Sequence, residues 1–349
     1  SMTLGLGPIR KPIVTAFSMD LNGNAITVSS GLHKAMQEID PESMNQRTTS
    51  VRALKSVIEG RKKAGKERLI FAVVYPFSSH NYELRYWMAS AGINPDHDVR
   101  LVVVPPPQMV TQMEQGLIDG YCVGEPWNTL AVQKGFGHTL ITKYEIWNNS
   151  PEKVLGVSEE WAEQYPNTHK ALIKALLEAC QWVDKPSNRL EVAALISQSV
   201  YVNAPEHIVR MSMTSTYQYA LGGMPETMPD FNVFHRYAAN YPWRSHAEWF
   251  LLQMIRWGHI TNPVDIHTVA DKVYRPDIFK AAADELGYIT PAIDRKPEGL
   301  QTTGWQIDGI DLGPDLFFDE QIYLPDYPLE YLSKFEQSNM STPAEALLK

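Results

Sequence analysis

The chain has 349 residues and a formal net charge of −9, and 44% of its residues are hydrophobic against 20% charged. This balance is typical of a globular protein long enough for two domains, and it excludes a disordered chain. The acidic charge argues against a nucleic-acid partner, no apolar run is long enough for a membrane span, and no signal peptide is visible at the first residues. A bound anion would need a local device, because the overall charge opposes it.

The first predicted elements are a strand over residues 12–19 and an Asx/Gly turn over residues 20–26. In this turn, Asn22 and Asn24 flank Gly23. Turn chemistry alone accounts for the two asparagines. A side-chain amide at the rim of a crevice would also be a neutral donor suited to ligand discrimination, so both interpretations stay open.

Three strand-to-helix units are predicted between residues 68 and 127, after a helix over residues 49–62. The strand patterns begin near Arg68, Val99 and Ile118, and each runs into a helix start. Helix N-termini present unsatisfied backbone N–H groups and the positive end of the helix dipole. Because ligand crevices in open α/β sheets lie at the carboxyl ends of the strands, the pattern predicts a site for a small anion there.

Five side chains at these helix starts are candidate ligand contacts. Ser78 and Ser79 stand where an N-cap belongs, and with His80 they are predicted to donate to an oxyanion; simple capping is the alternative. Gln108 follows a run of prolines that fixes the entry of the second helix. Trp127 opens the third helix, either as a wall of the ligand site or as a core residue.

The rest of the chain predicts two more strands and then mainly helices. The strands cover residues 139–143 and 153–157, and Lys143 and Lys153 accompany them as candidates for pairing with an anion. Ser158 is expected to cap a short helix that Pro166 separates from a longer one. Further helices are expected near 187–197, 205–220, 243–258 and 276–287, and the tail over 290–349 is expected to be irregular surface coil.

Catalytic signatures are missing from the sequence. It contains no P-loop, no G-x-S-x-G, no H-E-x-x-H, no C-x-x-C and no clean G-x-G-x-x-G after a strand. The spacing of His246 and Glu248 does not place them on one helix face, so no metal pair is expected there. Cys122 and Cys180 are expected to be buried thiols, and Glu125 a solvated acid. The chain is therefore predicted to be no enzyme and to need neither cofactor nor metal.

Seven motifs carry a resemblance to a known family. They include PFSSHNYELRYW at 76–87 and DGYCVGEPW at 119–127, and the others lie at 21–27, 92–96, 102–109, 145–156 and 243–250. Together they resemble the nitrate- and bicarbonate-binding proteins of ABC importers and the related cytoplasmic nitrate sensors. The resemblance implies a type-II periplasmic-binding-protein-like α/β fold with two lobes that clamp the ligand, no catalysis, and delivery to a membrane permease.

The resemblance also implies site residues. A ligand-binding glutamine of the family corresponds to Asn24, and its histidine falls opposite Phe77, with His80 as the nearby substitute. Its lysine falls at Asn148, with Lys153 as the nearest replacement. These departures leave nitrate, nitrite, bicarbonate and other small oxyanions open as ligands. The predicted ligand set is Asn24, Ser78, Ser79, His80, Gln108, Trp127 and Lys153.

The family begins with two or three βα units that this sequence lacks, so the first lobe is expected to be N-terminally incomplete and the C-terminal extension helical. The predicted division is residues 1–19 as remnant of lobe 1 and hinge, 20–138 as complete lobe 2, 139–290 as return to lobe 1 with a helical region, and 291–349 as irregular tail. Such a chain is expected to bind its anion weakly and to form a homodimer through exposed lobe-1 surface.

The resulting hypothesis is a periplasmic solute-binding component for nitrate, nitrite or bicarbonate that feeds an ABC transporter and contacts no nucleic acid directly. One alternative is a cytoplasmic nitrate-sensing regulator that sequesters an RNA-binding antiterminator. A second alternative is an enzyme like the synthases of the thiamine pyrimidine precursor, which use His/Cys clusters that are not evident here.

Overall fold

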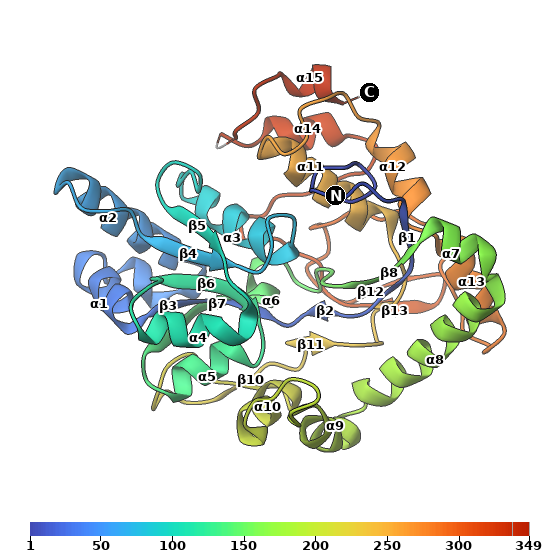
Figure 1. Cartoon of the computed structure of the whole chain (residues 1–349), viewed down its shortest axis with the longest axis horizontal. Helices are drawn as coiled ribbons and strands as arrows, with labels where there is room; N and C mark the ends of the chain where they lie inside the picture. The colour runs from blue at the N-terminus through green and yellow to red at the C-terminus, as the bar shows by residue number, and fades with distance from the viewer. Residues whose placement is uncertain (337, 349) are drawn as a thin grey trace. The chain divides into compact units, whose positions relative to one another are not determined.

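A computed structural model describes residues 1–336 and 338–348, which form two compact units (Figure 1). Unit 1 comprises Ser1–Asn22, Asn148–Asn188 and Val233–Lys349, and unit 2 comprises Gly23–Trp147 and Arg189–Asn232. The short strands β2 (Leu21–Asn22) and β11 (Asn232–Val233) stand where the chain passes from one unit to the other. Among the described helices, none combines the length and apolarity needed to cross a bilayer.

Unit 2 contains a five-stranded mixed sheet in the order β5-β4-β6-β3-β7. The strands β4 (Ile70–Val73), β5 (Arg100–Val103) and β6 (Gly120–Gly124) run parallel, which confirms the predicted β/α region. The strand β3 (Asn24–Ser29) runs antiparallel to both β6 and β7 (Gly137–Thr142).

Three helices follow the parallel strands as predicted: α3 (Ser79–Ser90), α4 (Pro106–Glu114) and α5 (Trp127–Gln133). The helix predicted over 49–62 is α2 (Ser50–Lys63). The side chains of α4 and α5 pack with β4 and β6 into one hydrophobic core cluster. The remaining helices and strands of unit 2 are α1 (Ser30–Ile39), the 3-10 turns η1 (Ser43–Asn45) and η2 (Arg47–Thr49), α6 (Lys143–Ile146), α9 (Arg189–Ile196), α10 (Glu206–Met213), β9 (Thr216–Tyr217) and β10 (Glu226–Thr227).

The turn predicted over residues 20–26 is wrong in its second half, because residues 24–29 form the buried strand β3. The turn shrinks to Asn22 and Gly23, both at positive φ (65° and 86°). Ala25, Ile26 and Val28 are almost completely buried, since β3 has a neighbouring strand on each side. The helix predicted over 205–220 likewise ends at Met213 and gives way to the β9–β10 pair.

Unit 1 is mainly helical around a two-stranded antiparallel sheet of β1 (Ile13–Ser18) and β8 (Val154–Ser158). Its core cluster includes Phe17, Leu177 and Phe279. Ser158 caps the helix that follows β8, as predicted, since its side chain accepts a hydrogen bond from the Trp161 N–H. The helices are α7 (Glu159–Gln164), α8 (Pro166–Asp184), η3 (Pro186–Asn188), α11 (Arg244–Arg256), α12 (Ile266–Val273) and α13 (Pro276–Asp284).

The tail predicted as irregular surface coil is wrong for much of its length. It contains the hairpin β12 (Trp305–Ile307) and β13 (Ile310–Leu312) and the helices α14 (Pro328–Ser333) and α15 (Ala344–Leu347). Tyr323 is fully buried, and Lys296 forms buried ion pairs with Glu298 and Asp315. Long-range packing, which leaves no local periodicity in the sequence, therefore orders this tail.

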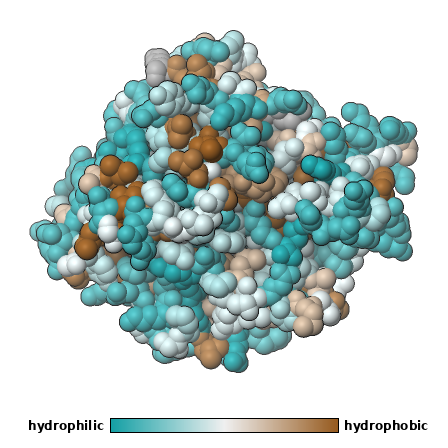
Figure 2. All heavy atoms as spheres, turned by 180° about the vertical axis from the view of Figure 1, so that it is seen from behind, coloured by the Kyte–Doolittle hydropathy of each residue, from teal (hydrophilic) through white to brown (hydrophobic). Residues whose placement is uncertain are grey.

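The two units divide the chain differently from the predicted segments. Residues 139–147 and 189–232 belong to unit 2, whereas the prediction placed them in a return to lobe 1. The reason for the first difference is β7, which completes the unit 2 sheet by pairing with β3. The surface in Figure 2 is mainly hydrophilic with separate hydrophobic groups.

Candidate functional site

At one end of the unit 2 sheet four strands finish and one begins, and we call this end of the sheet the strand-end edge. The parallel strands β4, β5 and β6 all end there. Because β3 is antiparallel, its first residue Asn24 pairs with Gly124, the last residue of β6. The strand β7 ends at the same edge, since its last residue Thr142 pairs with Ala25. The fold therefore brings residues from five separate segments to one rim.

A buried polar cluster lies at this edge around Glu83 of α3. The Lys143 Nζ atom is 2.8 Å from the Glu83 Oε1 atom, and the Asn24 Nδ2 atom is 3.3 and 3.2 Å from the two carboxylate oxygens. The Cys122 thiol donates to Oε2 at 3.7 Å. The side chains of Lys143 and Glu83 are only 2% and 8% exposed. We call these four residues the Glu83 cluster.

Local sequence places Lys143 in this cluster. It is the first residue of α6, directly after β7, and a capping box fixes the start of that helix. The Thr142 Oγ1 atom accepts from the Glu145 N–H at 3.4 Å, and the Glu145 carboxylate accepts from the Thr142 N–H at 2.8 Å. The helix therefore begins at a fixed residue, and the lysine directly after the cap meets Glu83.

The start of α3, the helix that carries Glu83, holds three of the predicted residues. The Ser78 hydroxyl accepts from the Asn81 N–H at 3.3 Å and donates to the Tyr75 carbonyl at 2.8 Å, which is the geometry of an N-cap. Ser79 and His80 are the first two residues of the helix, and His80 is buried. Capping accounts for the Ser78 hydroxyl, and ligand binding by these three residues stays a prediction.

The other four predicted residues lie in different surroundings. Asn24 is a member of the Glu83 cluster. Gln108 is exposed on α4, and Trp127 packs half-buried against the hydrophobic core of unit 2. Lys153 belongs to unit 1, where its side chain is 60% exposed and its Nζ atom lies 2.8 Å from Glu152. Only Asn24 of these four touches Glu83 in the hydrogen bonds described above.

Sequence reasoning missed Glu83 and Cys122 and favoured Lys153 over Lys143. A signal for Lys143 existed in the sequence. It directly follows an apolar strand pattern, and a lysine in that position lies at the end of the strand, where a ligand crevice is expected. A weaker signal for Glu83 was its helix, where large side chains such as Tyr82, Leu84 and Trp87 surround it, so that a charge buried among them needs a partner.

Glu125, at the end of β6, is not the solvated acid that the sequence suggested. Burial raises the pKa of its carboxyl to about 6, although hydrogen bonds from Thr129 act in the opposite direction. The Oε2 atom accepts from the Thr129 N–H at 3.2 Å. Cys122 and Cys180 are both buried, as expected. The described residues contain no group of three or more His, Cys, Asp or Glu side chains able to hold a metal ion.

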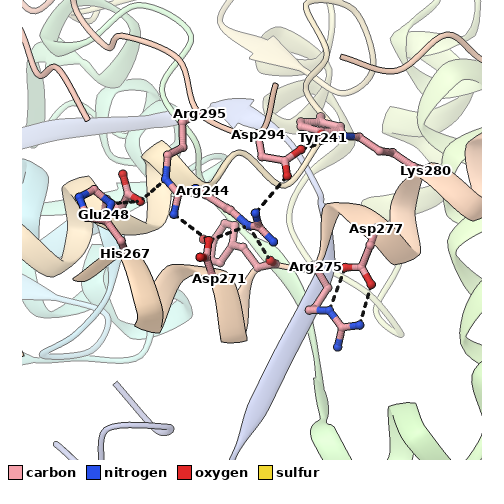
Figure 3. Close-up of polar contacts among 11 residues, drawn as sticks. Tyr241, Arg244, Glu248, His267, Asp271, Arg275, Asp277, Lys280, Asp294 and Arg295 are labelled. Carbon is pink, nitrogen blue, oxygen red and sulfur yellow. Dashed lines mark hydrogen bonds and ion pairs between the residues drawn. The ribbon is translucent and has the colours of Figure 1, made fainter. Parts of the chain in front are cut away.

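A second polar cluster lies in unit 1 around Glu248 of α11 (Figure 3). The Glu248 carboxylate accepts from His267 Nδ1 at 2.9 Å, from Arg295 Nε at 2.6 Å and from the Tyr323 hydroxyl at 2.9 Å. Arg295 also donates to Asp271 at 2.7 Å. We call this chain of contacts the Glu248 network.

The Glu248 network continues through Arg244, which pairs with both Asp271 and Asp294 (Figure 3). Lys280 and Tyr241 also contact Asp294, at 2.9 and 2.5 Å. Burial raises the pKa of Asp294, but these two hydrogen bonds together with the positive charges of Lys280 and Arg244 outweigh it and hold that pKa below its usual value. Charges of opposite sign alternate along the Glu248 network, which joins α11, α12 and α13. We therefore interpret the network as structural support that holds these three helices together.

Comparison with known proteins gives consistent results. A model of the NMT1-like family matches residues 1–197. The nitrate import ATP-binding protein NrtC of Synechocystis sp. is 36% identical over 96% of this chain and 46% of its own length. The bicarbonate transport ATP-binding protein CmpC of Synechococcus elongatus is 39% identical over 81% of this chain and 39% of its own length. The chain thus spans less than half the length of these two relatives.

Among solved structures, the periplasmic nitrate-binding protein NrtA of Synechocystis matches with a TM-score of 0.82 and 25% sequence identity. The match covers 96% of this chain and 80% of the NrtA chain. The two-unit α/β architecture described above is therefore of the periplasmic-binding-protein type.

Proposed function

This chain belongs to the NMT1-like family, and on that premise we propose that it binds a small inorganic anion, nitrate, nitrite or bicarbonate, for an ABC importer. Relatives named for nitrate import and for bicarbonate transport support the ligand class. The similarity to a periplasmic nitrate-binding protein supports a binding role in the periplasm. Because the chain spans only part of the length of these relatives, we infer its substrate and its permease partner from them only as part of this proposal.

The observation that carries the proposal is the buried ammonium group of Lys143 at the strand-end edge. A charge interaction is stronger there than in water because the surroundings are less polarisable. An anion at this edge gains a charge-assisted contact from Lys143 and a neutral donor from Asn24. Without an anion, Glu83 pairs with Lys143 and avoids the cost of an unpaired buried charge.

The Glu83 carboxylate offers a way to tell the candidate anions apart. Nitrate carries only acceptor oxygens, so the carboxylate repels it. Bicarbonate carries one O–H group, which can donate a hydrogen bond to Glu83. We therefore expect Glu83→Gln to weaken bicarbonate binding more than nitrate binding.

Isothermal titration of the full chain with nitrate, nitrite and bicarbonate tests the proposal. Lys143→Gln is expected to weaken binding of the preferred anion at least about tenfold, which corresponds to about 1.4 kcal/mol. The matched control is Lys134→Gln, a lysine of unit 2 that is 48% exposed and 3.9 Å from Glu114. Equal affinity of Lys143→Gln and the wild-type chain, with both folded by circular dichroism, would refute the proposal.

A second candidate role follows from the relatives named as ATP-binding proteins, which match up to 96% of this chain. The anion-binding module would then act together with an ATP-binding subunit of the importer and not as a diffusing carrier. ATP hydrolysis by the reconstituted importer distinguishes the roles. If the chain acts together with the ATP-binding subunit, adding the anion changes the rate of ATP hydrolysis even when no anion is transported. If the chain is a diffusing carrier, the anion changes that rate only when it is transported.

The remaining alternatives have separate tests. A cytoplasmic nitrate sensor would bind an RNA-binding antiterminator, which co-purification detects. The relatives reported above are named as binding or transport proteins, and this favours binding over catalysis. Homodimer formation stays a prediction, which sedimentation at high protein concentration checks.

A further inference from the structure

A cavity of about 480 Å³ lies within unit 1, among residues that take no part in the Glu83 cluster. Five aromatic side chains line it: His235, Tyr237, Tyr241, Phe279 and Tyr288. The volume lies within the range of small-molecule sites, which combine apolar and aromatic walls with a few polar groups.

Backbone strain gives a second, independent sign of a ligand site. The consecutive residues Tyr237 and Ala238, both in the cavity wall, have φ values of 62° and 52°. Left-handed φ values are costly for residues other than glycine, and strained residues concentrate at ligand-binding positions. Two such residues in succession along one wall persist only where the surrounding structure holds them tightly.

The surroundings supply that support. The Asp184 carboxylate accepts from the N–H groups of Phe234 and Arg236 at 3.2 and 2.8 Å, and from the Arg236 guanidinium at 2.7 Å. The Asn240 Nδ2 atom donates to the carbonyls of Ser18 and Phe234 at 3.0 and 2.8 Å. The segment is fixed at both ends, so the cavity wall is preorganised.

The hydrogen bonds of Asn240 determine the state of His235. Since the amide nitrogen of Asn240 donates to two carbonyls, its Oδ1 atom is the acceptor that faces His235 Nδ1 at 3.0 Å. His235 Nδ1 must then carry the proton, and in the neutral ring Nε2 is an acceptor. The Tyr288 ring packs edge-on against this imidazole, with the two centroids 5.5 Å apart.

The charges near the cavity argue against an anionic occupant. Arg236 pairs with Asp184 at 2.7 Å, and Lys280, whose Nζ atom lies 5.7 Å from the Tyr241 ring centre, pairs with Asp294 at 2.9 Å. Both cations are thus neutralised by their own carboxylates. A further polar group in the wall is Asp311, whose Oδ1 atom accepts a hydrogen bond from the Gln306 side chain.

We propose that this cavity binds a neutral, planar heteroaromatic base with N–H donors, the chemistry of a purine or pyrimidine base. The aromatic side chains offer faces and edges for stacking. His235 Nε2 and the Asp311 carboxylate accept from the N–H groups of the base. The site is independent of the anion site of unit 2, so either proposal can fail without the other.

Isothermal titration and ligand-observed NMR of the full chain with adenine test this inference, with benzoate as an anionic ring of similar size. Adenine is expected to bind, and benzoate to bind at least about tenfold more weakly. His235→Phe keeps the ring but removes the acceptor, and it is expected to weaken adenine binding at least about tenfold. Ile310→Trp fills the cavity and is expected to abolish binding. The control is His207→Phe, an exposed histidine on α10 of unit 2, with no expected change.

Thermal melting identifies any variant that fails to fold, and the benzoate comparison on the wild-type chain needs no variant. Three results would overturn the inference: no adenine signal at millimolar concentration, benzoate binding as tightly as adenine, or equal adenine affinity of His235→Phe and the wild-type chain. Nitrate titration of the same samples is expected to be unchanged, which separates this test from that of the anion site.

Discussion

The Glu83 cluster of unit 2 and the Glu248 network of unit 1 both centre on a buried glutamate, but they solve its burial differently. Two of the three partners of Glu248 reach solvent, since the side chains of His267 and Arg295 are 40% and 28% exposed, and Arg295 pairs with a further charge, Asp271 (Figure 3). Glu83 faces Lys143, which is as buried as the glutamate itself. Lys296 forms equally buried ion pairs in unit 1, so burial alone does not mark a site. The comparison teaches that the candidate site is marked by a buried ion pair that lies at the strand-end edge.

The largest effect is expected from breaking the buried pair in unit 2. Lys143→Met leaves the Glu83 carboxylate without its ammonium partner and should destabilise the chain by about 3–5 kcal/mol. Urea denaturation measures the loss. Combining Lys143→Met with Glu83→Leu removes both charges and should restore most of the stability. A single variant within about 1 kcal/mol of the wild-type chain would contradict the distinction drawn between the two clusters.

A smaller effect is expected in the Glu248 network. Glu248→Gln removes the charge that accepts from His267, Arg295 and Tyr323, and the loss should be about 2–3 kcal/mol, the contribution of a hydrogen bond to a charged group. The partly exposed side chains of His267 and Arg295 limit the cost. The matched control in unit 1 is Asp277→Asn, which breaks an exposed pair with Arg275 and should cost less than about 1 kcal/mol. Equal losses for the two variants would show that burial of Glu248 has no energetic weight.

The smallest effect concerns Glu125 and has a distinct pH dependence. Its folded-state pKa of about 6 lies above the ordinary value of 4.5, so the folded state holds the proton more tightly than the unfolded state. This contribution to stability is complete below pH 4.5 and is lost as the pH rises to about 6. Glu125→Gln should remove that dependence and stabilise the chain above pH 6.5 by up to about 2 kcal/mol. Denaturation curves between pH 4 and 7.5 measure it, and parallel curves for both chains would contradict it.

The elements that sequence reasoning predicted are those with local signals. β4, β5 and β6 are short apolar runs followed by helix starts, and the structure has each of them. The strand β3 escaped prediction because it begins among turn residues and is stabilised by its neighbours β6 and β7. The ordered tail escaped for the same reason, since the contacts of Lys296 and Tyr323 are long-range.

The candidate site shows the same limit. Glu83 and Lys143 stand 60 positions apart in the sequence, and no sequence motif contains both of them. The antiparallel pairing of β3 with both β6 and β7 brings Asn24, at the start of β3, and Lys143, just after β7, to the strand-end edge. The sequence could predict that helix starts and a neutral amide lie at the strand-end edge. It could not predict the pairing of Glu83 with Lys143, because that pairing depends on sheet topology.

The most direct test of the central claim, that the strand-end edge of unit 2 holds the anion, is a crystal structure of the chain with saturating nitrate or bicarbonate. We predict difference density for the anion within hydrogen-bonding distance of Lys143 Nζ and the Asn24 amide, with the contact between Lys143 and Glu83 lengthened. Anion density at another place, with the Lys143–Glu83 distance still near 2.8 Å, would contradict the account.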